Sequence, residues 1–558
     1  MTPDAAFRDA RDVLLRHATD LAAARAAFRW PALEYFNWVD HWFQPYARGN
    51  RRDALRVVTD AGTTALTFDE LELRSRSVAR YLRDAGVERG DRMLLMLTNV
   101  APLWETVLAA IRLGVVLIPA TAQLTPADLD DRIERGGVRH IVTDADGAAK
   151  LRDPERLRVR LSTVDVDKFA RFDDARAAEP KIDEVRTRAD EALLLYFTSG
   201  TTAKPKLVLH THASYPIGHL STMYWVGLRE NDVHQNISSP GWAKHAWSSL
   251  FAPWNAGATI VAHDQPRFSA RRALEVLREQ NVSTLCAPPT VWRMMILEDL
   301  GPRPPALREI VGAGEPLNPE VIDRVERAWG ITMRDGFGQT ETTAVIGNAP
   351  GQQVKPGSMG TPLPGYDATI VDAAGNPAAE GEVAIRIAPS RPLGLMQGYL
   401  DDPERTAAVM AGGLYRTGDE ARIDDEGYVH FVGRGDDVFK SSDYRISPFE
   451  LESVLVEHEL VAEAAIVPSP DALRLAVPKA FVVLRPGTPE TEATARSIFA
   501  FVRERLAPYK RIRRLEFAAL PKTISGKIRR VELRNMERDR RAREERGPLE
   551  FWSDELER

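Results

Sequence analysis

The sequence predicts an α/β fold with a large N-terminal domain and a smaller α+β domain after it. Short apolar strands alternate with amphipathic helices over residues 51–311, which is typical of a largely parallel sheet covered by helices. From about residue 350 the pattern changes to short β-like runs separated by Gly, Pro and Asp. This change predicts antiparallel sheet or a small barrel. A second set of helices and strands follows residues 433–437, so we expect domains at residues 1–434 and 435–558.

The expected elements of the first domain follow its apolar residues. The first 50 residues predict a helix over residues 5–27 and an aromatic run over residues 35–43 that packs on the following domain. Apolar residues at helical spacing predict an amphipathic helix over residues 68–85. Continuous apolar runs predict buried strands at residues 93–97, 115–118, 193–197, 259–262, 285–287 and 309–311.

The remaining elements are shorter. The β-like runs lie at residues 368–371, 382–387 and 428–432. In the C-terminal domain we expect a helix over residues 448–458 and strands near residues 464–467 and 480–484. The arginine-rich stretch at residues 529–546 has acids interleaved with bases, which favours a solvated helix over a nucleic-acid-binding arm.

The composition excludes several classes of protein. The chain has 558 residues, of which 44% are hydrophobic, enough for large buried cores. A formal charge of −6 gives no support to a nucleic-acid-binding or membrane-surface protein. The single cysteine, Cys286, fits a reducing compartment. Charged residues interrupt the N-terminus and the apolar region at residues 93–120, so we expect no signal peptide, no membrane insertion and a cytoplasmic location.

The clearest chemical signal is a loop rich in hydroxyls and lysines directly after an apolar strand, at residues 196–206. Backbone N–H groups, side-chain hydroxyls and positive charge in such a loop suit a polyphosphate. The loop does not match the G-x-x-x-x-G-K-[ST] pattern, which disfavours a P-loop NTPase. Its candidate ligand-binding residues are Thr198, Ser199, Gly200, Thr201, Thr202 and Lys206.

Six segments, in order along the chain, resemble motifs of the adenylate-forming superfamily of acyl-CoA synthetases, adenylation domains and luciferases. Within it, the medium-chain and aryl acyl-CoA synthetases (AMP-forming) are the most similar branch. The segments are the phosphate loop, the adenine segment Gly312-Ala313-Gly314-Glu315-Pro316, the segment Asp335-Gly336-Phe337-Gly338-Gln339-Thr340-Glu341, the ribose segment Tyr415-Arg416-Thr417-Gly418-Asp419, the hinge Gly433-Arg434-Gly435-Asp436-Asp437, and the lysine loop Pro521-Lys522-Thr523-Ile524-Ser525-Gly526-Lys527. The resemblance implies a large N-terminal domain of αβαβα-type sheets with a barrel-like β subdomain, and a mobile C-terminal domain.

The resemblance assigns roles that suit the side chains. Glu341 supplies a hard carboxylate for Mg²⁺, and Thr340 donates its hydroxyl to the α-phosphate. Asp419 accepts hydrogen bonds from the ribose hydroxyls. Lys527 stabilises charge that develops as a carboxylate attacks the α-phosphate. Further residues implied in ATP binding are Gly314, Glu315, Asp335, Gly336, Phe337, Gln339, Arg434 and Arg445.

The implied reaction has two steps. A carboxylic acid displaces pyrophosphate from ATP to give an acyl-adenylate, and CoA then takes the acyl group. Between the steps the C-terminal domain rotates about Asp436, which withdraws Lys527 so that the CoA thiol can attack. ATP, Mg²⁺ and CoA are therefore the expected cofactors, and a small carboxylic acid is the expected substrate.

The acid pocket is less readable. The segment at residues 240–247 resembles the lining of the acyl channel in medium-chain relatives. Gly338 stands where acetate-specific relatives carry a bulky aromatic residue, which predicts a pocket deeper than acetate needs. We expect Trp242, His245, Gly312, Phe337 and Gly338 to line it, with Trp247 and Trp254 as further aromatic walls. The tryptophans could equally be core residues, and His245 a structural histidine.

Some positions depart from the family pattern. Asp443 and Ser447 replace glycines, and the first of these borders the pantetheine tunnel in relatives, so Asp443 puts bulk and negative charge where the CoA thiol must pass. Ala203 replaces a glycine of the phosphate loop. Two alternatives therefore stay open. One is an adenylate-forming enzyme that does not use CoA, such as an ATP-dependent diazotase acting on an aminoaryl acid with nitrite, or an amide or carrier-protein ligase. The other is a catalytically silent binding protein.

Overall fold

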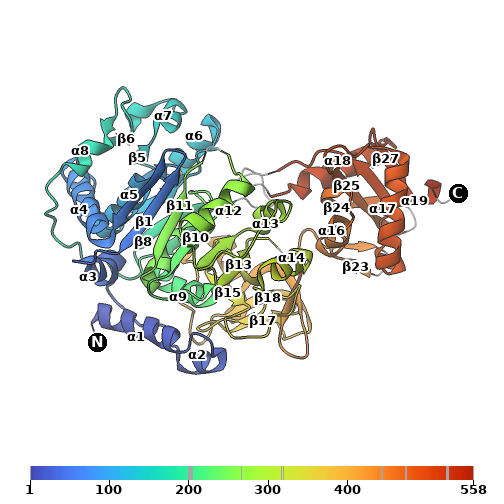
Figure 1. Cartoon of the computed structure of the whole chain (residues 1–558), viewed down its shortest axis with the longest axis horizontal. Helices are drawn as coiled ribbons and strands as arrows, with labels where there is room; N and C mark the ends of the chain where they lie inside the picture. Colours follow the sequence, from blue (N-terminus) through green and yellow to red (C-terminus); the bar gives the residue numbers. More distant parts are fainter. Residues whose placement is uncertain are drawn as a thin grey trace. The chain divides into compact units, whose positions relative to one another are not determined.

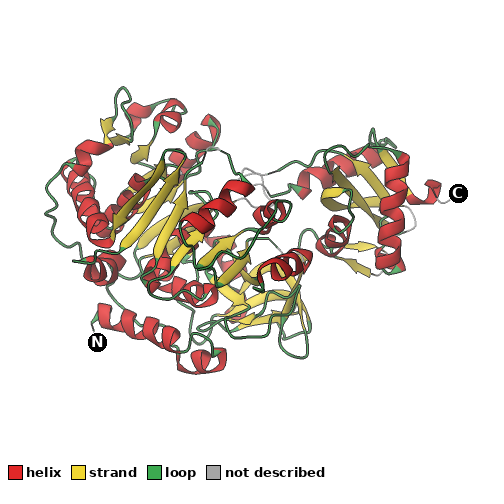
Figure 2. Ribbon diagram, viewed as in Figure 1, coloured by secondary structure: helices red, strands yellow, loops and turns green. Residues whose placement is uncertain are grey.

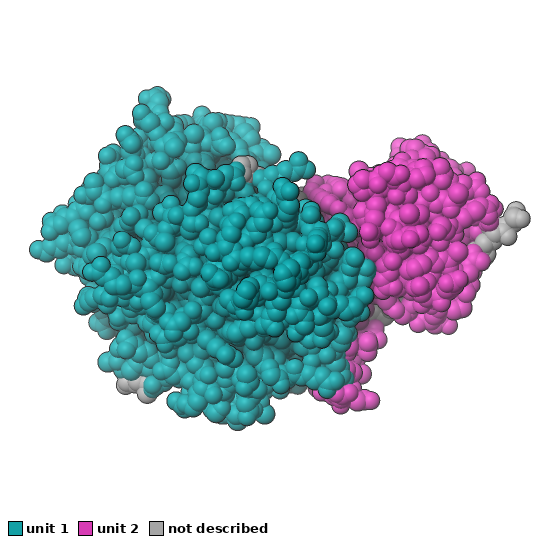
Figure 3. Space-filling view, viewed as in Figure 1, with its two compact units in different colours: residues 1–369, 384–415, 427–429 teal, residues 370–383, 416–426, 430–558 magenta. Residues whose placement is uncertain are grey.

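The computed structural model describes residues 2–198, 205–265, 267–315, 317, 319–441, 444–471, 474–522 and 527–556, and of Arg445 it describes the backbone only. The described chain forms two compact units, coloured separately in Figure 3. Unit 1 comprises residues 1–369, 384–415 and 427–429, and unit 2 comprises residues 370–383, 416–426 and 430–558. Unit 2 thus takes in two short segments that precede residue 430. The boundary expected at residue 434 stays a prediction.

A nine-stranded sheet dominates unit 1, with the strand order β16-β15-β14-β13-β12-β10-β11-β1-β2 (Figure 1). The inner pairs from β14 to β1 are parallel, and the pairs at both edges are antiparallel. Helices α12 (Ala270–Glu279) and α14 (Pro319–Trp329) pack on it, and their Leu277 and Val325 share one apolar core with Leu285 of the sheet. The strands are β16 (Thr361–Pro362), β15 (Ala344–Gly347), β14 (Arg334–Gly338), β13 (Glu309–Ala313), β12 (Thr284–Ala287), β10 (Val233–Asn236), β11 (Thr259–His263), β1 (Asp53–Thr59) and β2 (Gly62–Thr67).

A second sheet of eight strands has the order β19-β9-β8-β4-β3-β5-β6-β7. The strands from β8 to β7 pair in parallel, whereas β9 is antiparallel to both of its neighbours. Its core joins Leu94 and Ile118 of the sheet to Ile133 of α6. The strands are β19 (Gly398–Tyr399), β9 (Lys206–Thr211), β8 (Ala192–Thr198), β4 (Val116–Pro119), β3 (Arg92–Met96), β5 (His140–Thr143), β6 (Val159–Ser162) and β7 (Ala170–Arg171).

Helices cover these sheets, as Figure 2 shows. The described helices of unit 1 are α1 (Pro3–Arg16), α2 (Leu21–Ala27), α3 (Gln44–Ala47), α4 (Phe68–Asp84), α5 (Ala101–Leu113), α6 (Pro126–Gly136), α7 (Ala145–Ala149), α8 (Phe172–Arg176), α9 (Ser214–Val226), α10 (Ala243–Ala246), α11 (Ala252–Ala256), α12 (Ala270–Glu279), α13 (Pro289–Met295), α14 (Pro319–Trp329) and α15 (Pro403–Val409), with shorter helical turns η1 (Val39–Phe43), η2 (Pro154–Arg156), η3 (Trp247–Phe251) and η4 (Ala411–Gly413). Helix α4 begins at a capping box between Thr67 and Glu70.

Helix α9 is the central element of unit 1. Every one of its residues is buried, and it contacts β9 of one sheet and β13 and β15 of the other. Its polar side chains hydrogen-bond inside the protein, as His219 does with Thr222 and Ser221 with the Ala344 carbonyl, so the helix needs no solvent-facing side. Helix α9 therefore joins the two sheets that carry the candidate site.

The N-terminal segment differs in one respect from the expectation. The helix expected over residues 5–27 is two helices, because the turn at residues 17–20 separates α1 from α2 and Asp20 caps α2 through the N–H of Ala23. The aromatic run packs as expected: Phe36, Trp38 and Phe43 are fully buried.

A four-stranded sheet occupies the region where antiparallel sheet or a small barrel was expected. Its strand order is β17-β18-β20-β21. The strands are β17 (Ala368–Val371), β18 (Glu380–Arg386), β20 (Leu414–Ile423) and β21 (Val429–Arg434).

Unit 2 is built on a second four-stranded sheet, in the order β24-β25-β26-β27. Alternate residues face opposite sides, so Ile466 joins the core under α16 and α17, while Val467 joins Leu533 of α18. The elements are β22 (Phe439–Ser441), β23 (Tyr444–Ile446), α16 (Pro448–Val456), β24 (Val461–Asp471), β25 (Leu475–Leu484), α17 (Glu492–Arg505), η5 (Pro508–Lys510), β26 (Arg514–Phe517), α18 (Arg530–Ala542), β27 (Glu550–Trp552) and α19 (Ser553–Leu556).

The arginine-rich end forms the expected helix, α18, but the helix is not wholly solvated. Leu533 and Glu537 on its inner face are buried, Glu537 completely. Nowhere in the described ranges is a helix both long and apolar enough to span a bilayer.

Candidate active site

Three parallel strands of the nine-stranded sheet end next to segments that the sequence singles out. Strand β10 leads to Trp242 and His245, β13 ends just before Gly314, and β14 leads into residues 339–341. The carboxyl ends of parallel strands lie at one edge of a sheet, where ligands of open α/β sheets bind. Gly312 and Asp335 are direct partners across β13 and β14. The topology therefore brings the adenine, acid and α-phosphate segments to one edge.

Two glycines of β14 permit close packing by tryptophan rings. A Cβ on Gly336 would lie 2.4 Å from the Trp225 ring, and a Cβ on Gly338 would lie 2.4 Å from the Trp247 ring. These separations are far inside contact distance, so both positions need glycine. The Trp247 ring thus lies directly beside Gly338, and the expectation of a pocket deeper than acetate needs stays a prediction.

The other expected pocket residues differ in their surroundings. Trp242 precedes α10 and is half-buried, as is Phe337. Trp254 lies instead in the aromatic core against Phe43, with its indole N–H donating to the Ala54 carbonyl at 3.1 Å. His245 is buried and donates from Nε2 to Asn99 Oδ1 at 3.0 Å. Burial lowers the pKa of His245 to about 3, so the ring is neutral.

The adenine segment is held by polar contacts within unit 1. Gly314 adopts a φ of +101°, which favours glycine. Glu315 Oε2 accepts a hydrogen bond from the Thr290 hydroxyl at 2.8 Å, and Arg293 lies 3.2 Å away. Lys244 Nζ donates to the Ala313 carbonyl at 2.8 Å. Lys244 is therefore an addition to the residues expected here.

Asp335 is the most perturbed acid of the site. Its side chain accepts the Gly336 N–H at 2.8 Å. Burial raises the pKa of Asp335 to about 7, although this N–H and the charge of Lys244 oppose the rise.

Thr340 and Glu341 are tied to the strands next to the phosphate loop. His210 of β9 donates from Nε2 to the Thr340 carbonyl at 2.7 Å, and its Nδ1 accepts from the Ser214 hydroxyl at 3.1 Å. The Tyr399 hydroxyl donates to Glu341 Oε1 at 2.9 Å. Since burial lowers the pKa of His210 to about 3, this histidine stays neutral and keeps one tautomer.

The phosphate loop is described only at its two stems. Thr198, at the end of β8, pairs with Lys206, at the start of β9. Lys206 Nζ lies 5.1 Å from the centre of the Tyr399 ring. Ser199, Gly200, Thr201 and Thr202 lie outside the described residues. Gln339, the last expected contact of unit 1, accepts a hydrogen bond from the Tyr415 hydroxyl at 2.9 Å.

Unit 2 carries the remaining candidate residues. Asp419 is buried on β20, and Arg434 Nε lies 3.4 Å from its Oδ1 and 3.7 Å from Oδ1 of the hinge residue Asp436. Lys527 is exposed and stands directly before Ile528, which pairs with Lys522. Arg445 is described in its backbone alone, opposite Lys440, and Asp443 lies outside the described residues.

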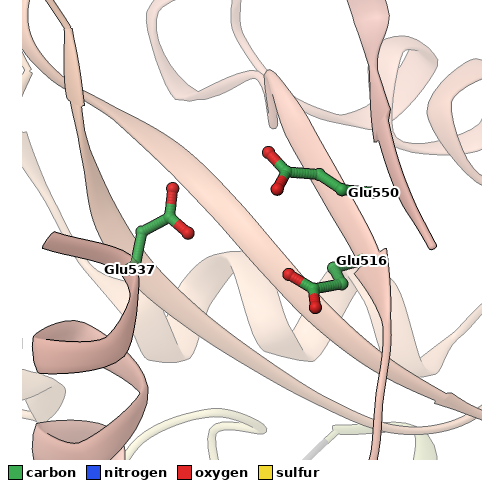
Figure 4. A group of neighbouring side chains, drawn as sticks. All are labelled: Glu516, Glu537 and Glu550. Atoms are coloured by element: carbon green, nitrogen blue, oxygen red, sulfur yellow. The ribbon is translucent and has the colours of Figure 1, made fainter. Parts of the chain in front are cut away.

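A cluster of three carboxylates in unit 2 is not a metal site. Glu516, Glu537 and Glu550 point toward one another from two strands and a helix (Figure 4). The ammonium of Lys479 lies 2.7, 2.7 and 2.9 Å from them. Lys479 therefore takes the position that a cation would need, and we call these four residues the glutamate cluster.

Matches to two family models identify the family of this chain. The model described as "AMP-binding enzyme" matches residues 44–400, and the model described as "AMP-binding enzyme C-terminal domain" matches residues 450–527. The chain belongs to the AMP-binding enzyme family. The expected membership of the adenylate-forming superfamily is confirmed, as is the α/β fold class.

Curated relatives of this AMP-binding enzyme are similar over almost the whole chain. The 4-hydroxybutyrate–CoA ligase 1 of Metallosphaera sedula is 42% identical over 541 residues, which cover 93% of this chain and 94% of the relative. The mitochondrial acyl-coenzyme A synthetase ACSM3 of Mus musculus is 37% identical, with 95% and 96% covered. This AMP-binding enzyme is accordingly an AMP-forming ligase of the acyl-CoA synthetase type, as the motifs predicted.

Solved structures of the family include similar folds. The anthranilate CoA ligase AuaEII in complex with anthranoyl-AMP superposes with a TM-score of 0.82 at 27% identity, covering 92% of this chain and 99% of that one. A benzoate CoA ligase from Burkholderia xenovorans superposes with a TM-score of 0.78 at 29% identity, covering 89% and 100%.

Three residues of this site escaped the sequence analysis: Lys244, His210 and Tyr399. Lys244 lies inside the segment at residues 240–247, so its charge among apolar neighbours was a usable signal. His210 and Tyr399 gave no such signal, because their partners lie 130 and 58 residues away along the chain.

Proposed function

We propose that this enzyme activates a medium-chain or aromatic carboxylic acid with ATP and transfers the acyl group to CoA. The observation that carries the proposal is the junction at Thr340 and Glu341. A buried, neutral His210 fixes the Thr340 backbone beside the strand that leaves the phosphate loop. Residues suited to the α-phosphate and to the polyphosphate are thus joined through β9 of unit 1.

The roles of unit 1 residues follow from their chemistry. We assign the adenine to the segment of Gly314 and Glu315 and the α-phosphate to the Thr340 hydroxyl. Glu341 fits a magnesium ion, because its carboxylate is hard, anchored through one oxygen and close to the phosphate-loop strand. When bound, Mg²⁺ would neutralise charge on the triphosphate.

The roles of unit 2 residues complete the proposal. We assign the ribose hydroxyls to Asp419, whose carboxylate is buried and oriented by Arg434. We assign Lys527 to the charge that develops on the α-phosphate during adenylation. We also propose that the chain divides at residue 434 with Asp436 as the hinge, and that the enzyme works in the cytoplasm. Limited proteolysis centred on residues 434–437 would support the division.

The proposed acids follow the relatives. The names of these relatives include 4-hydroxybutyrate, anthranilate and benzoate, so both aliphatic and aromatic acids occur among the similar ligases. The Trp247 ring beside Gly338 offers an aromatic wall to either class.

Release of pyrophosphate and AMP across an acid panel tests the proposal. The panel contains 4-hydroxybutyrate, straight-chain acids of medium length, benzoate and anthranilate, each with and without CoA, and anthranilate also with nitrite. We expect CoA-dependent turnover and a thioester product. Turnover that is indifferent to CoA, or that needs nitrite, would instead support the alternative that Asp443 suggests, and an Asp443→Gly variant would then gain thioester formation.

Two lysines of one loop provide a matched pair of variants. Lys527→Ala should slow acyl-adenylate formation about a hundredfold or more, as removal of a transition-state donor does. Lys522→Ala should leave the rate near that of the wild type, since Lys522 pairs with Glu463 at 2.7 Å. A wild type that forms no acyl-adenylate, and that binds ATP as tightly as Lys527→Ala does, would favour a silent binding protein.

A further inference from the structure

Tyr399 touches the residue that we assign to magnesium. Its hydroxyl donates to Glu341 Oε1 at 2.9 Å, and both side chains are buried. Strand β19, which carries Tyr399, pairs with β9 so that Tyr399 stands opposite Val208. A hydrogen bond to an ionised acceptor inside a protein is stronger than one between neutral groups. Glu341 is therefore held through Oε1, which leaves Oε2 available to a ligand.

The ring of Tyr399 faces the other end of the phosphate site. Lys206 Nζ lies 5.1 Å from the ring centre, within the range of a cation–π contact. Lys206 stands two residues before Val208 on β9, so the contact follows from the register of the two strands. One side chain thus contacts both the expected phosphate-binding lysine and the expected magnesium ligand.

The backbone next to Tyr399 supports the same arrangement. The Met396 N–H donates to the Glu341 carbonyl at 2.7 Å. Arg391 in turn donates to the Met396 carbonyl. The segment before β19 therefore fixes the backbone of Glu341 while Tyr399 fixes its carboxylate.

We propose that Tyr399 is a positioning residue for the adenylation step. Its hydroxyl sets the direction in which Glu341 presents Oε2 to Mg²⁺–ATP, and its ring places the Lys206 ammonium for the polyphosphate. The inference rests on the proposed function, because that assigns Glu341 to magnesium and Lys206 to phosphate. Tyr399 itself touches no reacting atom in this arrangement.

Two substitutions separate the two contacts. Tyr399→Phe removes the hydroxyl and keeps the ring, whereas Tyr399→Leu removes both. Tyr366→Phe is the matched control, because it deletes another buried hydroxyl of unit 1, one that lies 2.5 Å from Thr343 Oγ1 and does not contact Glu341. Thermal unfolding of each variant shows whether it folds.

The measurement is ATP binding without acid, by calorimetry on the full chain, across a magnesium titration and in EDTA. For Tyr399→Phe we expect the Mg²⁺ concentration that gives half-maximal enhancement of ATP binding to rise about tenfold, with binding in EDTA unchanged. For Tyr399→Leu we expect the same rise together with several-fold weaker binding in EDTA, since Lys206 loses its support. Tyr366→Phe should match the wild type in both conditions.

Each other outcome counts against the inference. A wild-type magnesium requirement in Tyr399→Phe would overturn it, as would equal losses with magnesium and with EDTA, which indicate general damage. If the wild type itself binds ATP no better with magnesium, the assignment of Glu341 fails and the inference with it. The acid panel then decides separately whether the ligase reaction stands.

Discussion

The polar interior of this enzyme is built in two opposite ways. Among its described residues unit 1 buries seven histidines, and we call the five whose pKa values are lowered most the histidine core: His210, His212, His219, His234 and His245. Their pKa values are lowered by burial, so they are neutral. Four of the five make hydrogen bonds, as His234 does with Thr284 and Ser248. The glutamate cluster of unit 2 buries full charges, and its three carboxylates are balanced by Lys479 together with Arg540 and Arg541.

The difference implies that acid should destabilise mainly unit 1, whereas removal of one buried charge should destabilise mainly unit 2. A buried histidine whose pKa is lowered contributes stability above the pKa that it has in the unfolded chain. This stability is lost as the pH falls from that value toward the lowered folded pKa. Burial alone raises the pKa of Glu550, but hydrogen bonds from the Gly547 N–H and Lys479, with the lysine charge, lower it below the ordinary value. The stability that Glu550 contributes is therefore present above the pKa of an unfolded glutamate and is lost only as the pH falls through the lowered folded pKa.

Acidification should have the largest effect, and it should fall on unit 1. As the pH falls from 7 to 5, each histidine whose folded pKa is about 3 lowers the free energy of unfolding by about 2 kcal/mol. Burial raises the pKa of Asp335 to about 7 and that of Asp40 to about 6. Because the folded state takes up these protons before the unfolded chain does, Asp335 adds about 2 kcal/mol and Asp40 about 1 kcal/mol to the free energy of unfolding as the pH falls from 7 to 5. The histidines therefore outweigh the acids, and unit 1 should lose several kcal/mol.

Hydrogen exchange read by mass spectrometry checks this for each unit. At pH 5, after correction for intrinsic rates, peptides of β10 and α9 should lose protection while those of β24 and β25 keep theirs. His234→Gln should reduce the loss in unit 1 by about 2 kcal/mol, since its proton site is gone. Earlier opening of unit 2, which contains the buried His458, would contradict the comparison.

The next largest effect should come from Lys479→Met. This change leaves three buried carboxylates without their central cation and should destabilise unit 2 by about 3 to 5 kcal/mol, with unit 1 unaffected. Chemical denaturation followed by hydrogen exchange separates the two units. Lys510→Met is the control, because Lys510 pairs with a half-exposed Glu450 at 2.6 Å and should cost at most about 1 kcal/mol. Equal losses of stability in Lys479→Met and Lys510→Met would mean that burial of the glutamate cluster does not affect the cost of removing its cation.

Asp335→Asn should make the stability of unit 1 fall more steeply as the pH is lowered. The pKa of Asp335 is raised, so the folded state binds a proton that the unfolded chain has released, and the group adds stability as the pH falls from 7 toward 4. The asparagine cannot titrate, so the loss between pH 7 and pH 5 should grow by about 2 kcal/mol. Urea midpoints of the two proteins at several pH values test this, and parallel curves would contradict it.

Arg530→Lys should have the smallest effect on stability. Arg530 binds both oxygens of Glu452, at 2.9 and 2.6 Å, and lies 3.8 Å from Asp437. Lysine cannot reproduce the forked contact, and we expect a loss of about 1 kcal/mol confined to unit 2. Because Arg530 follows Lys527 by three residues, adenylation should slow more than this loss explains. A rate of adenylation equal to that of the wild type would show that the contact between Arg530 and Glu452 does not affect the lysine loop.

The sequence predicted the elements whose pattern is local. The amphipathic helix expected over residues 68–85 is α4, and the strand expected at residues 93–97 is β3, because apolar spacing and the Thr67 cap act within a few residues. The motifs likewise singled out Thr340, Glu341 and Asp419, because each stands in a short contiguous segment of the sequence; their roles stay predictions. The break between α1 and α2 was missed, since a four-residue turn hardly changes the apolar pattern.

What the sequence did not predict depends on distant partners. The acid and base alternation at residues 529–546 suggested solvent on all sides, yet Glu537 meets Lys479 from 58 residues away. The Trp247 ring lies beside Gly338 from the helical turn η3, a distant part of the chain. Such contacts are set by tertiary packing and leave no periodic signal in either segment.

Cys286 gives the enzyme an internal reporter of one unit alone. It is the single cysteine of the sequence, and it lies on β12, in the middle of the nine-stranded sheet, with 1% of its surface exposed. A thiol reagent therefore reaches it only when that sheet opens. The rate of labelling of the unmodified protein measures how often unit 1 opens, without any contribution from unit 2.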